Sequence, residues 1–308
     1  MKQLILALLL IGTAYCPQAQ TNKVAAEDLA LMESLEDTLG LVSFLIVNDS
    51  TPENRFAATK KMIPTLVKAL KIKHSFSYPF EQLRAVSIQY PADSTFRVFT
   101  WQLYVDAEDY RYYGAIQMNT PELQLIPLID RTKEVQSEEQ DILTHDKWFG
   151  ALYYNIHQFD SPTGRQYLMF GFNGDSFFHK KKFIDVLSFK NGKASFGAPV
   201  FIEEDTISGR RTVRNRIVKE YSAETSIRMN YDETFELIIY DHLITVAGSY
   251  GQGPTSVPDG SYEGYQLAND GLWYYVEKVF DQVSEEAPRP EPVLNGGSKK
   301  DIFGKKKN

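Results

Sequence analysis

Between residues 24 and 47, apolar side chains recur every three or four positions along the chain. This spacing predicts one apolar stripe on an α-helix. The stretch "NDSTPEN" then indicates a break and a new helix, since Thr51 is a suitable N-cap and Pro52 suits the first helical position. A second apolar stripe follows, and we expect Pro64 to kink or interrupt this helix. Together the two segments predict a helical hairpin packed on a larger unit.

From Arg84 onward, apolar positions alternate with a period of two, which is typical of β-strands. The segment "FRVFTWQLYV" is apolar on both faces and predicts a central strand. The turns "DSPTG" and "KNGK" each separate two such segments, and Asn191-Gly192 is a strong hairpin signal. Connections this short indicate antiparallel pairing, because a parallel pair needs a long crossover.

The predicted fold class is therefore α+β and mainly β, with an N-terminal helical hairpin packed on a large antiparallel β-sheet or β-sandwich. We assign the hairpin to residues 21–78 and the antiparallel β-domain to residues 79–287. The similar segments "YYGAIQMN" and "WFGALYYN" are interpreted as two strands of one sheet, although a propeller-like arrangement stays open. Helical spacing also suggests a final helix at residues 273–284.

The first 20 residues have the features of a signal peptide, because Lys2 precedes an apolar run that small and polar residues follow. The run is too short for a transmembrane helix, which needs roughly 20 residues. We expect cleavage and export to the periplasm or the cell exterior as a soluble chain without a transmembrane segment.

The only cysteine, Cys16, lies within this predicted signal peptide. A lipid anchor at Cys16 is disfavoured, because the bulky Tyr15 occupies the position where a bacterial lipobox has a small residue. The mature chain is thus expected to lack cysteine, and with it disulfides and thiol chemistry.

The chain carries 40 Asp and Glu against 33 Lys and Arg, a net charge of −7. Most charged residues in the segment 288–308 are basic, so the part of the chain that precedes this segment is more acidic than the chain as a whole. An acidic body argues against nucleic acid as a partner, because phosphate contacts need a basic face. The last segment is rich in Pro, Gly and Lys with few apolar residues, which predicts a flexible basic tail at residues 288–308.

The stretch "YDHLITVAGSYGQGPTSVPDGSYEGY" places an Asp-His pair before a glycine-rich segment that contains a serine. It does not match a hydrolase elbow, which needs Gly-x-Ser-x-Gly between a strand and a helix. It matches neither a phosphate loop nor a dinucleotide fingerprint. We interpret "GPTSVPDG" as a loop. Asp241 and His242 end an apolar strand, where neighbours point to opposite faces, so we expect them to cap the strand rather than to pair.

The five histidines show no His-x-His or His-x-x-x-His spacing, so the sequence predicts no metal site and no cofactor. One enzymatic alternative stays open. A glycan or ester hydrolase could use dispersed carboxylate and histidine residues, with Asp241 and His242 as the catalytic candidates.

Aromatic doublets recur on the predicted strands. Because adjacent strand residues face opposite sides, one ring of each doublet packs inside and the other faces outward. The outward rings are the candidates for ligand binding, and we select Trp148, Tyr154 and Tyr112. The competing interpretation is that such rings fill the cores of sheets.

The segments "WFGALYYNI", "YLMFGF", "DVLSF", "FGAPVF", "YDHL" and "PDGSYEGY" resemble an uncharacterised family of exported, signal-peptide-bearing proteins of Bacteroidota. The resemblance covers about residues 20–285 and implies export. It brings no catalytic residues and no substrate. We therefore expect a non-enzymatic protein that binds an unknown protein or glycan of the cell envelope. The sequence has many aromatic residues on its predicted strands, but it shows no nucleophile motif, no metal-ligand spacing and no cofactor-binding loop.

Overall fold

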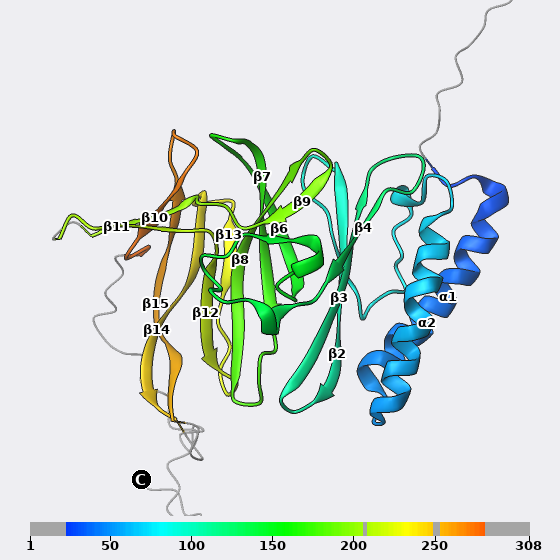
Figure 1. Ribbon diagram of the computed structural model, residues 1–308, viewed down its shortest axis with the longest axis horizontal. Helices are drawn as coiled ribbons and strands as arrows, with labels where there is room; N and C mark the ends of the chain where they lie inside the picture. Colours follow the sequence, from blue (N-terminus) through cyan, green and yellow to red (C-terminus); the bar gives the residue numbers. More distant parts are fainter. Residues whose placement is uncertain (1–22, 206–207, 249–252, 281–308) are drawn as a thin grey trace, which may run out of the picture.

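The computed structural model describes residues 23–205, 208–248 and 253–280. These residues form four layers, from right to left in Figure 1: a pair of helices and three β-sheets. The fold is α+β and mainly β, with the N-terminal helices packed on largely antiparallel sheets, which confirms the predicted class. The predicted signal peptide at residues 1–20 and the predicted tail at residues 288–308 lie outside the described residues.

The helical layer consists of α1 (Ala26–Asn48) and α2 (Pro52–Leu70). Ahead of α2, the Asp49 carboxylate accepts the backbone N–H of Thr51 at 2.8 Å. Helix α2 runs through Pro64 without a break, so the predicted interruption is absent. Pro64 is exposed, and the opposite, buried face of α2 is held by packing along its whole length. The buried apolar residues of this layer are Met32, Leu35, Leu39, Val42, Ile46, Ala58, Met62, Leu66, Ala69 and Leu70.

The helix-side sheet lies directly against these helices. Its strands follow the order β1-β2-β3-β4 and pair antiparallel. They are β1 (Ser87–Gln89), β2 (Phe96–Asp106), β3 (Asp109–Met118) and β4 (Leu125–Ile129). Strand β2 is buried on both faces, since Phe99 packs toward the helices whereas Phe96 and Val98 pack toward the next sheet. The prediction of a central strand is confirmed.

The central sheet has the order β5-β9-β8-β7-β6, and β12 pairs with β8 beside this path. Its strands are β5 (Leu143–Thr144), β6 (Leu152–Ser161), β7 (Gly164–Asn173), β8 (His179–Lys190), β9 (Lys193–Phe196) and β12 (Ile217–Ser222). Both predicted hairpins are present. Asn191 and Gly192 have φ of 52° and 73° between β8 and β9, as a two-residue type I′ turn requires.

The outer sheet has the order β11-β10-β16-β15-β14-β13. Its strands are β10 (Phe201–Glu204), β11 (Arg211–Arg214), β13 (Met229–Asp232), β14 (Leu237–Ala247), β15 (Pro254–Leu267) and β16 (Trp273–Val276). The β10–β16 pair is parallel, which departs from the expected antiparallel pattern. The long stretch of chain between these two strands supplies the crossover that a parallel pair needs.

Three other predictions are wrong. The segment predicted as a helix from residue 273 begins with β16, which pairs with both β15 and β10. "GPTSVPDG" lies almost wholly in β15, and its Pro258 is tolerated because β15 pairs there with β14 alone. The similar segments at residues 112–119 and 148–155 belong to different sheets rather than to one. In each case the pairing partner, which a local pattern does not encode, decides the outcome.

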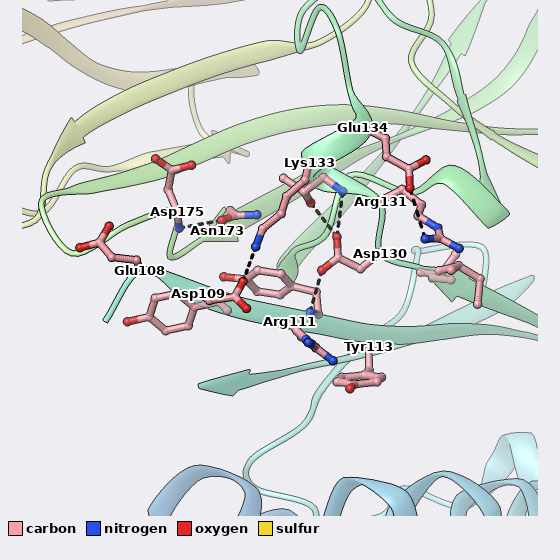
Figure 2. A pocket seen from close by; sticks show the side chains of 15 residues that line it. Glu108, Asp109, Arg111, Tyr113, Asp130, Arg131, Lys133, Glu134, Asn173 and Asp175 are labelled. Carbon is pink, nitrogen blue, oxygen red and sulfur yellow. Dashed lines mark hydrogen bonds and ion pairs between the residues drawn. The ribbon is translucent and has the colours of Figure 1, made fainter. Parts of the chain in front are cut away.

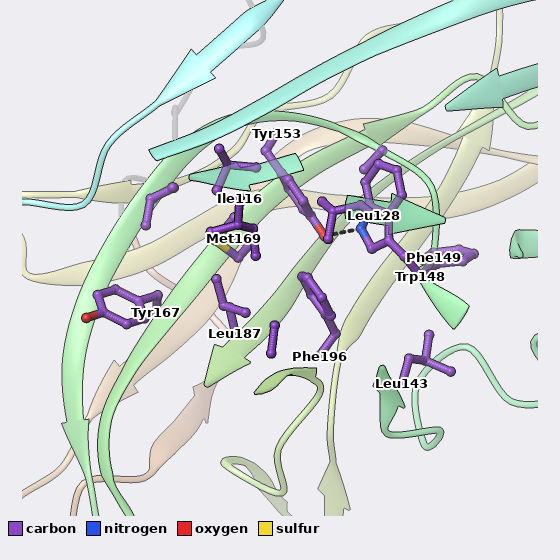
Figure 3. Close-up of a cluster of buried hydrophobic side chains, with 14 of the residues drawn as sticks. Ile116, Leu128, Leu143, Trp148, Phe149, Tyr153, Tyr167, Met169, Leu187 and Phe196 are labelled. Atoms are coloured by element: carbon purple, nitrogen blue, oxygen red, sulfur yellow. Dashed lines mark hydrogen bonds between the residues drawn. The ribbon is translucent and has the colours of Figure 1, made fainter. Parts of the chain in front are cut away.

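Apolar cores fill the spaces between the layers. Figure 3 shows the core between the helix-side and central sheets, which includes the large side chains of Trp148, Phe149 and Tyr153. Strands β7 and β8 supply side chains to two cores at once. Met169 contributes to the core of Figure 3, whereas its neighbour Leu168 packs toward the outer sheet. The central sheet is therefore covered on both faces.

Among the ion pairs of the described residues, the pair of Arg216 and Asp185 is the one in which both side chains are fully buried. Arg216 Nε lies 3.0 Å from Asp185 Oδ2. The guanidinium also lies over the Phe149 ring at 5.6 Å and donates from Nη1 to the Glu138 carbonyl oxygen at 2.5 Å. These contacts join β8, the start of β12 and the loop before β5.

Gly264→Ala is expected to destabilise the protein by about 3 kcal/mol, because overpacking would have to displace backbone. A Cβ at this position of β15 would lie 2.0 Å from the Ile238 carbonyl oxygen. The control is Gly192→Ala, where nothing lies within 4 Å and only the positive φ is unfavourable, at about 1 kcal/mol. Urea unfolding gives both free energies, and an equal loss in the two variants would contradict the close approach.

Arg216→Met is expected to cost about 3–5 kcal/mol in the free energy of unfolding, because the Asp185 carboxylate stays buried without its partner. The double variant Asp185→Leu/Arg216→Met removes both charges and should recover most of that loss. A double variant that is less stable than either single variant would show that the charged pair itself is net stabilising.

Candidate functional site

A groove of about 590 Å³ opens where β3 begins, at one end of the helix-side sheet. Its walls come from β3, from β4 with the segment that follows it, and from the connection between β7 and β8 (Figure 2). Tyrosines, carboxylates and basic side chains line it together. The β7–β8 connection is far from β3 and β4 in the sequence, so this wall of the groove exists only because the first two sheets stack.

Alternation along β3 sends neighbouring side chains of the groove to opposite faces of the sheet. Tyr110 and Tyr112 face the central sheet. Tyr113 faces the helices and stacks on Trp101, with ring centroids 5.6 Å apart. Arg111 is on that same side and lies over an aromatic ring of α2 at 5.2 Å. The rim of the groove therefore has aromatic and cationic groups on both sides of one strand.

Tyr112 forms the floor of the groove. Its side chain is buried, and its hydroxyl oxygen accepts the backbone N–H of Gly174 at 2.5 Å. Burial raises the pKa of Tyr112 well above its usual value, so the phenol stays neutral at all ordinary pH values. The hydrogen bond ties the β7–β8 connection to β3 and fixes the width of the groove.

Tyr110 forms a half-buried wall beside Tyr112. The Lys180 Nζ lies 5.2 Å from the centroid of the Tyr110 ring and donates to the carbonyl oxygens of Gly174 and Ser176, at 3.0 and 2.7 Å. Burial lowers the pKa of Lys180, although nearby carboxylates oppose that change. The ring is thus held in one orientation by a fixed cation.

Most charges of the groove are paired. The ion pairs are Lys133 with Asp109 at 2.7 Å, Arg131 with Glu134 at 3.2 Å, and Lys181 with Asp175 at 3.0 Å. The Lys133 side chain is 80% exposed, so solvent screens its pair and a ligand can reach it. In Figure 2, the Lys133 side chain extends across the groove to Asp109.

Asp130, an acid near the centre of Figure 2, has a structural role. Its carboxylate accepts the backbone N–H groups of Tyr112 and Thr132, at 2.9 and 3.0 Å, and the Thr132 hydroxyl at 2.7 Å. Gly150 packs so closely that a Cβ there would lie 2.7 Å from the Asp130 carboxyl carbon. This carboxylate is therefore fully occupied in joining β3 to the segment after β4.

The arrangement suits binding better than hydrolysis. Hydrolysis by carboxylates needs two acidic groups placed to act as acid and as base or nucleophile. In this groove the carboxylates of Asp109, Asp130, Glu134 and Asp175 already have protein partners, which leaves Glu108 as the one lining acid without a hydrogen bond or ion pair among the described residues. Aromatic rings beside exposed charges offer stacking and hydrogen bonding to a polar ligand.

Of the predicted ligand-binding residues, the structure brings Tyr112 alone to the groove, and there as its buried floor. Trp148 has no exposed surface, and its Nε1 donates to the Tyr153 hydroxyl at 2.8 Å (Figure 3). Tyr154 is half-buried and donates to the Met229 carbonyl oxygen at 2.7 Å. Trp148 and Tyr154 thus join layers of the fold rather than presenting a surface.

The predicted catalytic alternatives, Asp241 and His242, do not pair with each other. Asp241 is buried and accepts the backbone N–H of Arg228. His242 is 41% exposed, and its Nδ1 lies 2.9 Å from Oδ2 of Asp259. Ser261 donates its N–H and its hydroxyl to Asp259 rather than to His242, at 2.9 and 2.7 Å. Among the described residues, no hydroxyl is hydrogen-bonded to His242 Nε2, and neither residue lines the groove.

The sequence did not reveal the groove. Residues 131–141 follow β4 outside any strand, and nothing in this charged segment indicated that Lys133 lines a groove together with tyrosines. The aromatic doublets of β3 were a usable signal, since they singled out Tyr112. No sequence pattern indicated that Asp175 lines the groove, because only the position of the β7–β8 connection in the fold brings it close to β3.

No protein-family model, curated protein or solved structure matches this chain. No helix of the described residues has both the length and the apolar character needed to cross a membrane. Within the same residues, no group of three or more His, Cys, Asp or Glu side chains is placed to hold a metal ion.

Asp259→Asn is expected to destabilise the protein by about 1 kcal/mol near neutral pH, because it weakens hydrogen bonds to a carboxylate. The bonds from Ser261 and His242 lower the pKa of Asp259 from 3.8 to about 2. Because the folded pKa lies below the unfolded one, this stabilisation is present above about pH 4 and is lost as the pH falls toward 2. Urea unfolding at several pH values should show the wild-type advantage shrinking over that window, and a constant difference would contradict the assignment.

Proposed function

We propose that this chain is an exported, non-enzymatic binding protein whose groove at the start of β3 takes a protein or glycan segment of the cell envelope. One observation carries the proposal. The groove combines the Tyr110 ring, held by Lys180, with the exposed Lys133, while four of its five carboxylates, all but that of Glu108, are engaged by the protein itself. The apolar run after Lys2 and the resemblance to exported proteins of Bacteroidota support an envelope location.

The chemistry of the groove favours a polar, uncharged or mixed-charge ligand. Tyrosine rings stack on sugar rings and on peptide planes, and their rigid side chains lose little entropy on binding. The ion pairs Lys133–Asp109 and Arg131–Glu134 are exposed enough to exchange partners with a ligand at small cost. A strongly anionic polymer is disfavoured because acidic side chains pair with Arg131 and Lys133.

The test is binding of the purified protein to arrays of envelope glycans and peptides, with affinities then measured by biolayer interferometry. Arg131→Ala/Lys133→Ala is expected to weaken binding about tenfold, or about 1.4 kcal/mol. The matched control is Lys61→Ala/Lys68→Ala, which removes two exposed charges from α2, outside the groove. If both double variants bind the ligand equally well, the groove is not the ligand-binding site.

The contact between His242 and Asp259 keeps one enzymatic alternative open, a glycan or ester hydrolase. An aspartate that orients a histidine is part of many hydrolytic sites, but such sites also need a nucleophile or a second acid in reach. A screen of glycan and ester substrates decides between the two functions. Turnover that is lost in His242→Ala or in Asp241→Asn would overturn the binding proposal.

A further inference from the structure

A second cavity, of about 540 Å³, lies at the opposite end of the helix-side sheet, where β2 begins and β3 ends. Phe76, Pro79 and Pro121 give it apolar walls, and the remaining lining residues are His74, Tyr90 and small polar side chains. No carboxylate is among the lining residues that the structure describes. This absence distinguishes the cavity from the groove, which is rich in acids.

Arg97 lies behind this cavity, on the helix-facing side of β2, with no exposed surface. Its guanidinium donates only to neutral acceptors: Gln117 Oε1 at 2.8 Å, the carbonyl oxygens of Tyr78 and Ser75 at 2.6 and 2.9 Å, and the Tyr90 hydroxyl at 2.8 Å. Among the ion pairs of the described residues, none includes Arg97. A buried cation without an anion is costly, so its retention calls for a physical reason.

Aromatic rings surround the Arg97 guanidinium. Its Cζ lies 4.7 Å from the ring centroid of Phe99, 5.1 Å from that of Phe80, 5.4 Å from that of Phe76 and 5.8 Å from that of Tyr90. The faces of these rings attract the cation, but they carry no net charge. Burial lowers the pKa of Arg97, which reflects the cost of its charge in this position. The region around Arg97 therefore keeps a net positive potential.

Tyr90 connects that charge to the cavity. Its hydroxyl oxygen accepts a hydrogen bond from Arg97 Nη1, so its own proton is available to an acceptor on the cavity side. Tyr90 is 40% exposed, and the structure gives its hydroxyl no acceptor among the described residues. A hydroxyl that accepts from a cation becomes a stronger donor, because hydrogen bonds in a chain polarise one another.

Two further groups of the cavity have no hydrogen-bond partner for their side chains among the described residues. They are the Ser94 hydroxyl and the His74 imidazole. The backbone places both, since Ser94 and His74 have φ of 52° and 59°, in the left-handed region. The cavity therefore offers three neutral hydrogen-bond donors and the charge of the buried Arg97. These groups suit a ligand with one negative charge better than a ligand with two, because removing a doubly charged group from water costs more than they can offset.

We infer that this cavity binds a small organic carboxylate that carries an apolar group. The carboxylate accepts hydrogen bonds from Tyr90 and from Ser94 or His74, and Arg97 acts through Tyr90 without touching the ligand. The apolar group lies against Phe76 and the prolines that flank it. This site is separate from the groove and does not depend on the proposed function.

The probe for this inference is benzoate, compared with its neutral analogue benzamide and with inorganic phosphate. Affinities come from isothermal titration, and NMR shifts of the Arg97 Nε–H report whether the ligand is near Tyr90. Benzoate is expected to bind at least tenfold more tightly than benzamide. Phosphate is expected to bind more weakly than benzoate, because it makes no use of the apolar walls and needs more charge compensation.

Tyr90→Phe is the decisive variant, since it keeps the ring that packs on Phe76 and removes only the hydroxyl. It should lower benzoate affinity about tenfold and leave benzamide affinity unchanged. The matched control is Tyr104→Phe, which removes the hydroxyl of a similarly exposed tyrosine that also lies under an arginine, Arg55 at 5.0 Å. The control should bind benzoate as the wild type does.

Four outcomes would overturn the inference. They are failure of benzoate to bind at tens of millimolar, equal affinity for benzoate and benzamide, tighter binding of phosphate than of benzoate, and a Tyr90→Phe variant that binds benzoate unchanged. Urea unfolding of both variants shows that a loss of affinity reflects the missing hydroxyl and not a loss of fold.

Discussion

The burial of both faces of the central sheet is the constraint on which the other layers depend. Strands β7 and β8 send Met169 and Phe183 to one core and Leu168 and Ile184 to the other. A sheet that is apolar on both faces must be covered on both, so the helix-side sheet and the outer sheet are each required. The helix-side sheet in turn has an apolar outer face, which the α1–α2 pair covers. The order of layers follows from which faces remain apolar.

Polar contacts then determine how the layers are positioned relative to one another. Lys219 on β12 of the central sheet reaches Glu263 on β15 of the outer sheet at 2.5 Å, and Tyr275 donates to the same carboxylate at 2.5 Å. Between the first two sheets, the Thr100 hydroxyl of β2 accepts the backbone N–H of Tyr153 on β6 at 3.1 Å. Apolar burial is non-directional, whereas these contacts are satisfied in one relative placement only. They therefore give the stacked sheets a defined register.

The two cavities of the helix-side sheet have opposite chemistry at opposite ends of the same strands. At the start of β3, carboxylates and basic groups neutralise one another around Tyr110 and Tyr112. Where β3 ends, Arg97 is buried without an acid and only neutral donors face the cavity. Strand alternation contributes to the difference, because Tyr110 and Tyr112 face the central sheet, whereas Arg97 faces the helical layer. One sheet thereby offers a mixed-charge groove and a positively biased cavity.

The sequence by itself determined the local elements of this protein. Apolar stripes at helical spacing gave α1 and α2, alternation gave most strands, and Asn191-Gly192 gave a turn, because each depends on neighbours a few residues apart. Tertiary structure decided everything that depends on distant partners. It made residues 273–276 a strand between β10 and β15, buried Trp148, and paired His242 with Asp259 instead of Asp241. The groove and the Arg97 cavity belong to this second group. Stacking of the sheets brings the β7–β8 connection to the groove, and strand pairing brings the turns that follow β1 and β3 to the segment after α2 at the cavity.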